Sequence, residues 1–298
     1  MTYHKPVMLA ECLEGLNINP GGIYVDVTFG GGGHSKAILD KIKTGRLLGF
    51  DQDPDANANA LDDKRFTLVN HNFEYLKNYL EYHKAIPVNG LLADLGISSH
   101  QIDQPERGFS TRFDAQLDMR MDKDSANTAK DIINNRSEKD LHKIFGMYGE
   151  ITNARELARC VVMARNSKPI NTTTELKEAI KPCVKRGKEN KYYAQVFQAL
   201  RIEVNRELEV LKSLLTQSAE VMEKGGRLVV MSYHSLEDRL VKNFINKGKF
   251  SGEIEKDFYG NDIKPFKAIN RKAITASEEE IAENPRARSA KLRIAERI

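Results

Sequence analysis

The sequence is short of cysteine, long apolar runs and low-complexity tracts, and each shortage argues against a class of protein. The three cysteines, at positions 12, 160 and 183, lie far apart with no C-x-x-C pair. Their number and spacing argue against a disulfide framework or a zinc site and indicate reduced thiols in a cytoplasmic protein. Neither a signal-peptide core nor an apolar run of about 18 residues occurs, so we expect no membrane span.

The sequence also lacks a strong excess of one charge. Lysine and arginine number 46 against 42 acids, which gives a net charge of +4 and an isoelectric point of about 8.7. This balance permits a nucleic-acid partner without requiring one, because the placement of charge matters more than its sum. With 40% hydrophobic and 30% charged residues, a globular fold of one large or two modest domains is expected.

What the chain does contain is a glycine-rich turn near its start. Residues 23–25 predict a short buried strand, which is followed by Asp26, by glycines at 30–33 and by a helix from about Ser35. This order places backbone N–H groups and a helix N-terminus against a nucleotide-like ligand. The glycine spacing differs from the dinucleotide fingerprint, and the preceding acid resembles the first motif of S-adenosylmethionine-dependent methyltransferases.

Further strands follow at the rhythm of a nucleotide-binding sheet. Strands predicted at 47–50, 66–70 and 88–93 are followed respectively by Asp51, by a segment that contains Phe73, and by Asp94. Because the carboxyl ends of parallel strands line the ligand crevice, Asp51 is expected to bind a ribose diol. Phe73 either packs on an adenine ring or staples the next helix. We therefore predict an α/β doubly wound fold.

Asp53 has a different explanation from Asp51. It is followed by Pro54 and a short polar segment, which is typical of a helix N-cap with proline at the first helical position. We assign Asp51 to the ligand and Asp53 to capping.

The alternation of strands and helices stops between about residues 103 and 206. Helices are predicted around 137–145, 151–164, 174–184 and 193–215, with apolar stripes typical of helix cores. We interpret residues 104–206 as an inserted helical domain for substrate recognition, and residues 1–103 with 207–298 as one discontinuous domain. The lysines and arginines of the insertion can contact phosphates, although a solvated surface explains them more simply.

The strand pattern returns near the end of the chain. A strand predicted at 225–231 is followed by Tyr233 and His234, and further strands at 266–269 and 291–294 complete a sheet of seven mostly parallel strands. His234 is either a catalytic residue or a hydrogen-bonded structural histidine, with about equal weight. At the other end of the chain, His4 and Lys5 either line the site or are merely exposed.

Taken together, these stretches resemble the MraW family of bacterial 16S ribosomal RNA (cytosine-N4) methyltransferases, also called RsmH. The segments span nearly the whole chain in the family's order and are far more specific together than any single motif. They are HKPVMLAE (4–11), TFGGGGHS (28–35), ADLGISSHQ (93–101), LDMRMD (117–122), FQALRI (197–202), SYHSLEDR (232–239) and residues 284–297. The resemblance implies a Rossmann-like class I sheet and S-adenosylmethionine as cofactor.

The resemblance further implies the acceptor and the residues of the site. The acceptor is the exocyclic N4 of a cytosine in the decoding region of 16S ribosomal RNA, within the small ribosomal subunit; no metal is implied. The cofactor-binding residues implied are Gly32, Gly33, His34, Asp51, Phe73, Asp94 and Gln101. RNA contacts are expected from Tyr233, Arg201, Arg239, Arg286, Arg288, Lys291 and Arg293. A monomer and a homodimer stay equally open.

The chemistry of the acceptor assigns a role to Asp94. The lone pair of the cytosine amino group is delocalised into the ring, so a carboxylate that accepts its N–H would stabilise the developing positive charge. Asp94 is the candidate, unless it serves only the cofactor, and His234 and Tyr233 are candidates to orient or stack on a flipped-out base.

Rival functions stay open at this point. They are a methyltransferase that acts on another nucleic acid or a small molecule, a nicotinamide-dependent oxidoreductase, and a non-enzymatic RNA-binding module. The glycine spacing disfavours the oxidoreductase, and the acids at strand ends disfavour the binding module.

Overall fold

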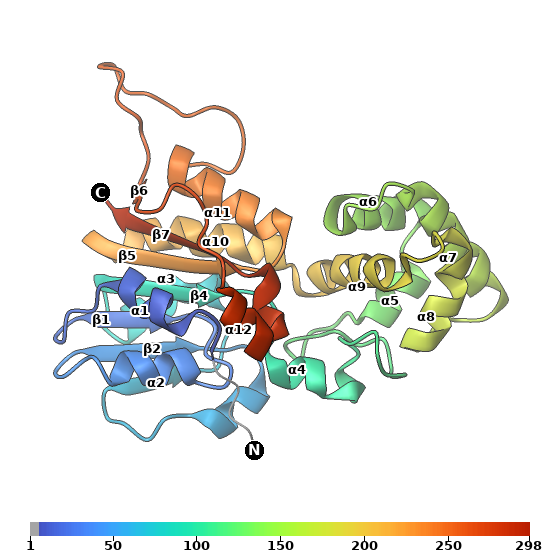
Figure 1. Cartoon of the computed structure of the whole chain (residues 1–298), viewed down its shortest axis with the longest axis horizontal. Coiled ribbons are helices and arrows are strands. Elements are labelled where there is room, and N and C mark those ends of the chain that lie inside the picture. The colour runs from blue at the N-terminus through green and yellow to red at the C-terminus, as the bar shows by residue number, and fades with distance from the viewer. Residues whose placement is uncertain (1–5) are drawn as a thin grey trace. The chain divides into compact units, whose positions relative to one another are not determined.

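The chain forms two compact units in a computed structural model that describes residues 6–298 (Figure 1). The sheet unit comprises Met1–Gly96 and Leu208–Ile298, and the helical unit comprises Ile97–Glu207. The helical unit therefore begins a few residues before the start of the expected insertion at 104. His4 and Lys5 lie outside the described residues.

The sheet unit is built on seven strands among the described residues, in the order β3-β2-β1-β4-β5-β7-β6. β1 to β5 run parallel, whereas β7 is antiparallel to both β5 and β6. The strands are β1 (Ile23–Asp26), β2 (Arg46–Phe50), β3 (Phe66–Val69), β4 (Val88–Asp94), β5 (Met222–Ser232), β6 (Phe266–Ala268) and β7 (Lys291–Arg297). The predicted seven-stranded, mostly parallel sheet is confirmed.

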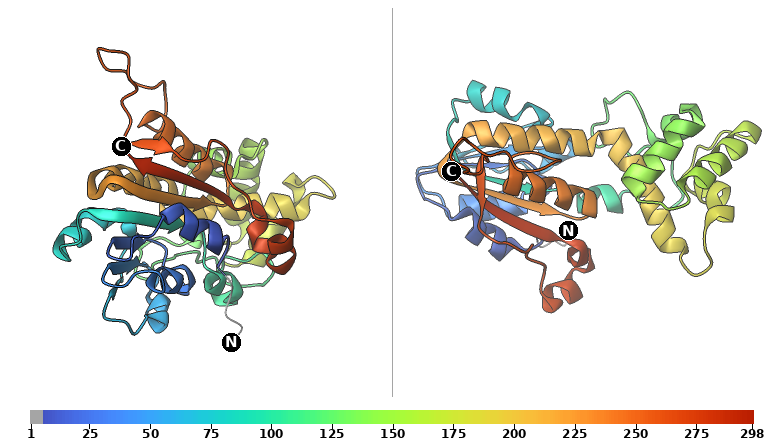
Figure 2. Two further views of the ribbon diagram at one scale, coloured as in Figure 1. Left: turned by 60° about the vertical axis from the view of Figure 1, so that its left-hand side comes forward. Right: turned by 90° about the horizontal axis from the view of Figure 1, so that it is seen from above.

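Helices cover both faces of this sheet (Figures 1 and 2). Successive strand residues point to opposite faces, so Val25 joins the core beneath α3, α10 and α11, while Tyr24 joins the core beneath α1 and α2. Both side chains are fully buried, which explains why consecutive residues of β1 are apolar. The helices are α1 (Leu9–Leu16), α2 (Gly33–Leu39), α3 (Leu76–Tyr82), α10 (Glu207–Val221), α11 (Ser235–Lys247) and α12 (Glu278–Glu283).

The strand order changes direction between β1 and β4. The chain moves outward from β1 through β2 to β3 and then returns to lay β4 on the other side of β1. Ligands of open α/β sheets bind in the crevice outside the carboxyl ends of the strands at such a switch point. Asp26 ends β1 and Asp94 ends β4, so both acids lie at the place where a ligand is expected.

The helical unit has its own apolar core, in which α6, α7 and α9 contribute Phe145, Leu157 and Leu200. Its α-helices among the described residues are α4 (Ser99–Asp103), α5 (Ala129–Asn135), α6 (Glu138–Gly149), α7 (Ala154–Ser167), α8 (Thr173–Ile180) and α9 (Glu189–Asn205). The prediction of one helix over 193–215 is wrong. α9 ends at Asn205 because Arg206 takes a left-handed conformation (φ 51°), and α10 begins directly after it.

Two further sequence observations have a structural counterpart. Cys160 and Cys183, far apart in the sequence, lie with their Sγ atoms 2.7 Å apart in the helical unit, and all three cysteines are free thiols. Among residues 6–298, none of the helices is both long and apolar enough to cross a membrane.

Candidate active site

Asp26 ties the end of β1 to the start of α2. Its side chain is 1% exposed, and Oδ2 accepts a hydrogen bond of 2.7 Å from the Ser35 hydroxyl. Oδ1 accepts the backbone N–H of Thr28 at 3.1 Å. The acid that precedes the glycines thus shapes the turn, because its oxygens are already engaged within the protein.

The glycines at 32 and 33 are required by conformation and by space. Gly32 has φ +73°, in the left-handed region, and a Cβ on Gly33 would lie 2.4 Å from Pro6 Cγ. A Cβ on Gly31, in contrast, would meet nothing within 4 Å, so the turn is open on that side. α2 begins at Gly33 and ends at Leu39 instead of starting near Ser35, since the left-handed Gly32 already serves as its N-cap.

Asp51 joins the carboxyl end of β2 to the glycine turn. Its Oδ2 accepts the backbone N–H of Gly30 and its Oδ1 that of Asp53, both at 2.8 Å. Burial raises the pKa of Asp51 to about 6 even though these two N–H groups oppose the rise. Each oxygen keeps a lone pair for a hydroxyl donor.

The capping role predicted for Asp53 is confirmed, because its side chain accepts from Asp55 N at 3.1 Å.

Asp94 stands at the carboxyl end of β4 and is held from several sides. Its backbone N–H donates to Thr28 Oγ1 at 2.7 Å, and its Oδ1 accepts the Tyr233 hydroxyl at 2.8 Å. Its Oδ2 lies 3.8 Å from His34 Nδ1, and the side chain stays 23% exposed. Burial raises the pKa of Asp94 to about 6, although His34 and Tyr233 both act to lower it.

The neighbours of Asp94 fix where protons lie. His34 Nε2 is 3.1 Å from the Val7 carbonyl, which can only accept, so Nε2 carries hydrogen. The other ring nitrogen, Nδ1, faces Asp94 Oδ2. Burial and the charge of Asp94 raise the pKa of Tyr233, so its hydroxyl stays protonated and donates. The hydrogen bond from Tyr233 to Asp94 joins residues 139 positions apart, so it could not be predicted from a local sequence pattern.

His234 and Phe73 have structural roles beside the functions predicted for them. His234 is the N-cap of α11, where its Nδ1 accepts the backbone N–H of Glu237 at 3.4 Å and the buried Glu237 carboxylate accepts the backbone N–H groups of Tyr233 and His234. Phe73 opens the short 3-10 helix Phe73–Tyr75 and packs, partly buried, against the core. Glu237 was not identified from the sequence, although E three positions after a cap residue is a capping-box signal.

The predicted residues of the helical unit are engaged within that unit. Gln101 is 5% exposed and completes a capping box with Ser98 at the start of α4. Arg201 forms a bidentate pair with Glu207, at 2.8 and 3.1 Å, which leaves its guanidinium little freedom to reach a phosphate. Cofactor binding by Gln101 and RNA binding by Arg201 therefore stay predictions.

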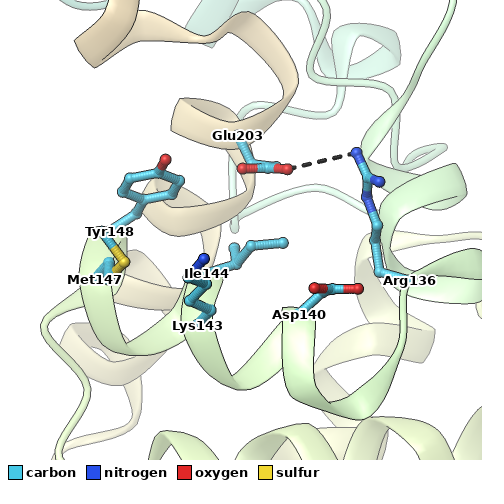
Figure 3. A pocket seen from close by; sticks show the side chains of 7 residues that line it. All are labelled: Arg136, Asp140, Lys143, Ile144, Met147, Tyr148 and Glu203. Atoms are coloured by element: carbon cyan, nitrogen blue, oxygen red, sulfur yellow. Dashed lines mark ion pairs between the residues drawn. The ribbon is translucent and has the colours of Figure 1, made fainter.

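The helical unit also carries a pocket of about 270 Å³ that contains none of the predicted residues (Figure 3). Arg136 and Glu203 face each other across it at 3.6 Å. Its lining residues are Arg136, Asp140, Lys143, Ile144, Met147, Tyr148 and Glu203.

The basic residues predicted to contact RNA near the C-terminus differ in exposure. Arg239 and Arg288 are exposed, and Arg286 is half-buried in the 3-10 helix Pro285–Ser289. Arg293 is 8% exposed and donates to Asp238 at 2.7 Å, which makes it part of the fold. Lys291, which the sequence also predicted to contact RNA, lies 3.7 Å from the other oxygen of Asp238.

The residues around the switch point fit a nucleoside ligand. Asp51 directly follows β2, and Asp94 is the last residue of β4. Both carboxylates have raised pKa values, and both can still accept hydrogen bonds from hydroxyl or amino donors. The glycine turn between them has open space at Gly31. Such a set of oxygens suits a ribose diol and an amino group better than it suits a phosphate, which two carboxylates would repel.

The fold and this site define a Rossmann-like class I methyltransferase: a mostly parallel sheet with an antiparallel β7, a glycine turn after β1, and acids at strand ends. The chain belongs to the MraW methylase family, whose model matches residues 1–298. It is therefore an enzyme that uses S-adenosylmethionine as methyl donor.

Relatives cover the whole chain. Proteins named ribosomal RNA small subunit methyltransferase H from Cytophaga hutchinsonii, Flavobacterium johnsoniae and Bacteroides thetaiotaomicron are 63%, 57% and 55% identical to it. The alignments cover 99%, 100% and 100% of this chain and 99%, 99% and 98% of theirs. A crystal structure of an rRNA methylase from Streptococcus thermophilus aligns over 100% of this chain and 99% of its own at 12% identity, with a TM-score of 0.43. At this identity and TM-score, the comparison with the Streptococcus thermophilus protein assigns no role to any residue of this chain.

Proposed function

We propose that the protein transfers a methyl group from S-adenosylmethionine to the exocyclic N4 of a cytosine in the decoding region of 16S ribosomal RNA. The observation that carries this proposal is the Asp94 carboxylate at the switch point, fixed by Tyr233 and partly open to solvent. The names of the relatives, which are small-subunit ribosomal RNA methyltransferases, support the acceptor.

The cofactor would be held by residues that follow or end β1 to β4, together with Gln101 of α4. Asp51 would accept the ribose hydroxyls with the lone pairs that Gly30 and Asp53 leave free. Gly32, Gly33 and His34 would contact it at the turn, and Phe73 would lie beside the adenine. Asp94 and Gln101 would serve the methyl-donor end. When bound, the cofactor supplies a methyl group on a sulfonium, whose leaving group needs no protonation.

The protein's own contribution is alignment and the stabilisation of charge. Asp94 would accept an N–H of the cytosine amino group, which increases the electron density on nitrogen and stabilises the positive charge that develops as the new C–N bond forms. The Tyr233 hydroxyl holds Asp94 Oδ1 in place, so Oδ2 is the oxygen left for the base. The raised pKa of Asp94 favours uptake of the proton that the methylated nitrogen must lose.

The helical unit would recognise the RNA. Residues 97–207 form a unit with its own apolar core, which supports an inserted recognition domain at 104–206 that could present a surface without disturbing the sheet. Lys185 and Lys188 precede α9, and Lys188 is exposed. In the sheet unit, Arg239 and Arg288 are exposed and are therefore candidates for phosphate contacts, whereas Arg293 is largely buried.

Transfer of labelled methyl groups, followed by nucleoside analysis, tests the proposal. The acceptors would be small ribosomal subunits that lack the modification, the protein-free 16S RNA, and a DNA control. N4-methylcytidine from the subunits or the RNA supports the proposal. Label only in DNA, or in no acceptor despite measurable binding of S-adenosylmethionine, would favour another nucleic acid or a small molecule as the acceptor.

A further inference from the structure

The segment between α11 and β6 projects from the sheet unit as a narrow arm, which we define as residues 253–264 (Figures 1 and 2). Its base is fixed. The Phe250 ring stacks on Phe244 of α11 with centroids 5.1 Å apart, and Asn243 donates to the Phe250 carbonyl at 2.9 Å. Phe266, at the start of β6, is fully buried. The arm therefore extends from two anchored ends.

The tip of the arm is an ordered turn. Asp257 N donates to the Asn261 carbonyl at 2.9 Å, and Ile263 N donates to the Glu255 carbonyl at 2.8 Å, as in a hairpin. The Asp257 carboxylate accepts the backbone N–H groups of Tyr259 and Asn261 and the Asn261 side-chain amide, at 2.8 to 3.0 Å. Gly260 supplies the left-handed residue that the turn needs, with φ +86°.

This ordered tip presents two aromatic side chains to solvent. Phe258 is 97% exposed and Tyr259 is 86% exposed, and their rings meet edge to face at 5.6 Å. A turn of this kind could be built with polar residues alone, and fully exposed neighbouring aromatics mark interaction sites in soluble proteins. Because the backbone of the tip is already held, a partner that buries the rings would lose little entropy in ordering them.

The charge of the arm distinguishes between classes of partner. Residues 253–264 contain two lysines and four acids, so the arm lacks the excess of cations that attracts a nucleic acid. Two of the four acids are paired with lysines: Glu255 with Lys249, which precedes the arm, at 3.0 Å, and Asp262 with Lys264 at 3.4 Å. An acidic arm with two adjacent exposed aromatic side chains is better suited to a basic protein surface, which can bury the rings as anchors, than to a polyanion.

We propose that the arm inserts Phe258 and Tyr259 into an apolar pocket on a protein component of the small ribosomal subunit. This inference rests on the proposed function, which makes that particle the substrate. The acidic arm can approach a basic protein surface without the repulsion that a cationic arm would meet. The arm would then recognise the assembled particle, and the catalytic site the base.

The experiment compares the double variant Phe258→Ala/Tyr259→Ala with the wild-type protein for binding to small subunits and to protein-free 16S RNA. We expect the dissociation constant for subunits to rise about tenfold or more, the usual effect of truncating two buried anchors. The dissociation constant for protein-free RNA should stay within about twofold. Because both side chains are exposed, the melting temperature should not change. Tyr82→Ala, at an aromatic side chain 79% exposed on α3, is the matched control and should alter neither affinity.

Every other outcome overturns the proposal. An equal loss on subunits and on protein-free RNA would assign the tip to base stacking. Loss of self-association by analytical ultracentrifugation, with unchanged subunit affinity, would assign the tip to a second copy of the chain. Unchanged subunit affinity alone would leave the tip without this role. Failure of the proposed function is seen separately, because it would appear as absence of methyl transfer by the wild-type protein.

Discussion

At the scale of single residues, Asp51 and Asp94 carry most of the chemistry, and both are carboxylates that the fold makes expensive to ionise. Burial raises the pKa of each from 3.8 to about 6. In the absence of ligand they therefore oppose folding at neutral pH, which is typical of residues kept for binding or catalysis. Two predictions follow from the sign of this shift.

The first concerns stability. Asp94 binds a proton more tightly in the folded protein than in the unfolded one, so its stabilising contribution is complete below pH 4 and is lost as pH rises through about 6. Asp94→Asn removes this dependence and keeps an acceptor for Tyr233. The stability of the variant relative to wild type should thus increase between pH 4 and pH 7.5, by at most about 3 kcal/mol.

Thermal unfolding at a series of pH values measures this difference. Asp63→Asn is the control, because Arg65 lowers the pKa of Asp63 to about 2 and the relative stability of that variant should hardly change over the same range. A flat difference for Asp94→Asn would show that its carboxylate is not destabilised by burial.

The second prediction concerns cofactor affinity. Ionised Asp51 can accept hydroxyl donors on both oxygens, whereas the protonated form offers one acceptor fewer. The dissociation constant for S-adenosylmethionine should therefore rise as pH falls below about 6, by up to about tenfold per pH unit. Calorimetric titration between pH 5 and pH 8 measures it. Asp51→Asn should bind more weakly at pH 8 and with a shallower pH profile; identical profiles would remove Asp51 from the site.

At the scale of elements, the central strands and the polar residues at their ends could be predicted, because burial on both faces makes most residues of β1, β2 and β4 apolar. Asp51 and Asp94 were identified in this way, and the cap at Asp53 from the proline that follows it. The break at Arg206 could not be foreseen, because the apolar pattern continues through it and arginine is a good helix former. Pairs such as Tyr233 with Asp94 depend on strands meeting across the sheet, which a single sequence does not reveal.

Substitutions at the N-cap of α11 distinguish between the two roles predicted for His234, structural and catalytic. If His234 only caps the helix, asparagine should replace it with little change, since asparagine is a preferred cap, whereas alanine should destabilise the protein by about 1 kcal/mol. Both variants should then keep methyl transfer within about threefold of wild type once folded. Unfolding curves and initial rates decide the question. A loss of more than about 100-fold in His234→Asn would instead assign His234 to catalysis.

The glycine turn offers a matched pair of substitutions. A Cβ on Gly33 would meet Pro6 at 2.4 Å, so Gly33→Ala should displace the segment before α1 and lower the melting temperature. Gly31→Ala meets no protein atom within 4 Å and should leave the melting temperature unchanged. Differential scanning calorimetry compares them. Equal stability of the two variants would contradict the tight packing of the turn on Pro6.

At the scale of the whole molecule, the division into a sheet unit and a helical unit has the order that the sequence indicated, while the charged surface could not be sorted from sequence. Arg288 and Arg293 look alike in the chain, yet one is exposed and the other is buried against Asp238. Arg288→Ala should reduce the slope of log affinity for RNA against log salt by about 0.7 to 0.9 without changing the melting temperature.

Arg293→Ala is the contrasting variant. It should lower the melting temperature, because Asp238 loses a buried partner, and should leave the salt slope nearly unchanged. Filter binding at several salt concentrations measures both slopes. An unchanged slope for Arg288→Ala would make Arg288 a surface charge with no part in RNA binding.

The central claim is that Asp94 acts on the acceptor amino group and does more than hold the cofactor. Single-turnover methyl transfer to small subunits, at saturating S-adenosylmethionine, tests it most directly by comparing wild type with Asp94→Asn. We predict a fall in rate of about 100-fold or more, with a dissociation constant for S-adenosylmethionine that changes much less. A near-normal rate with unchanged cofactor affinity would contradict the claim.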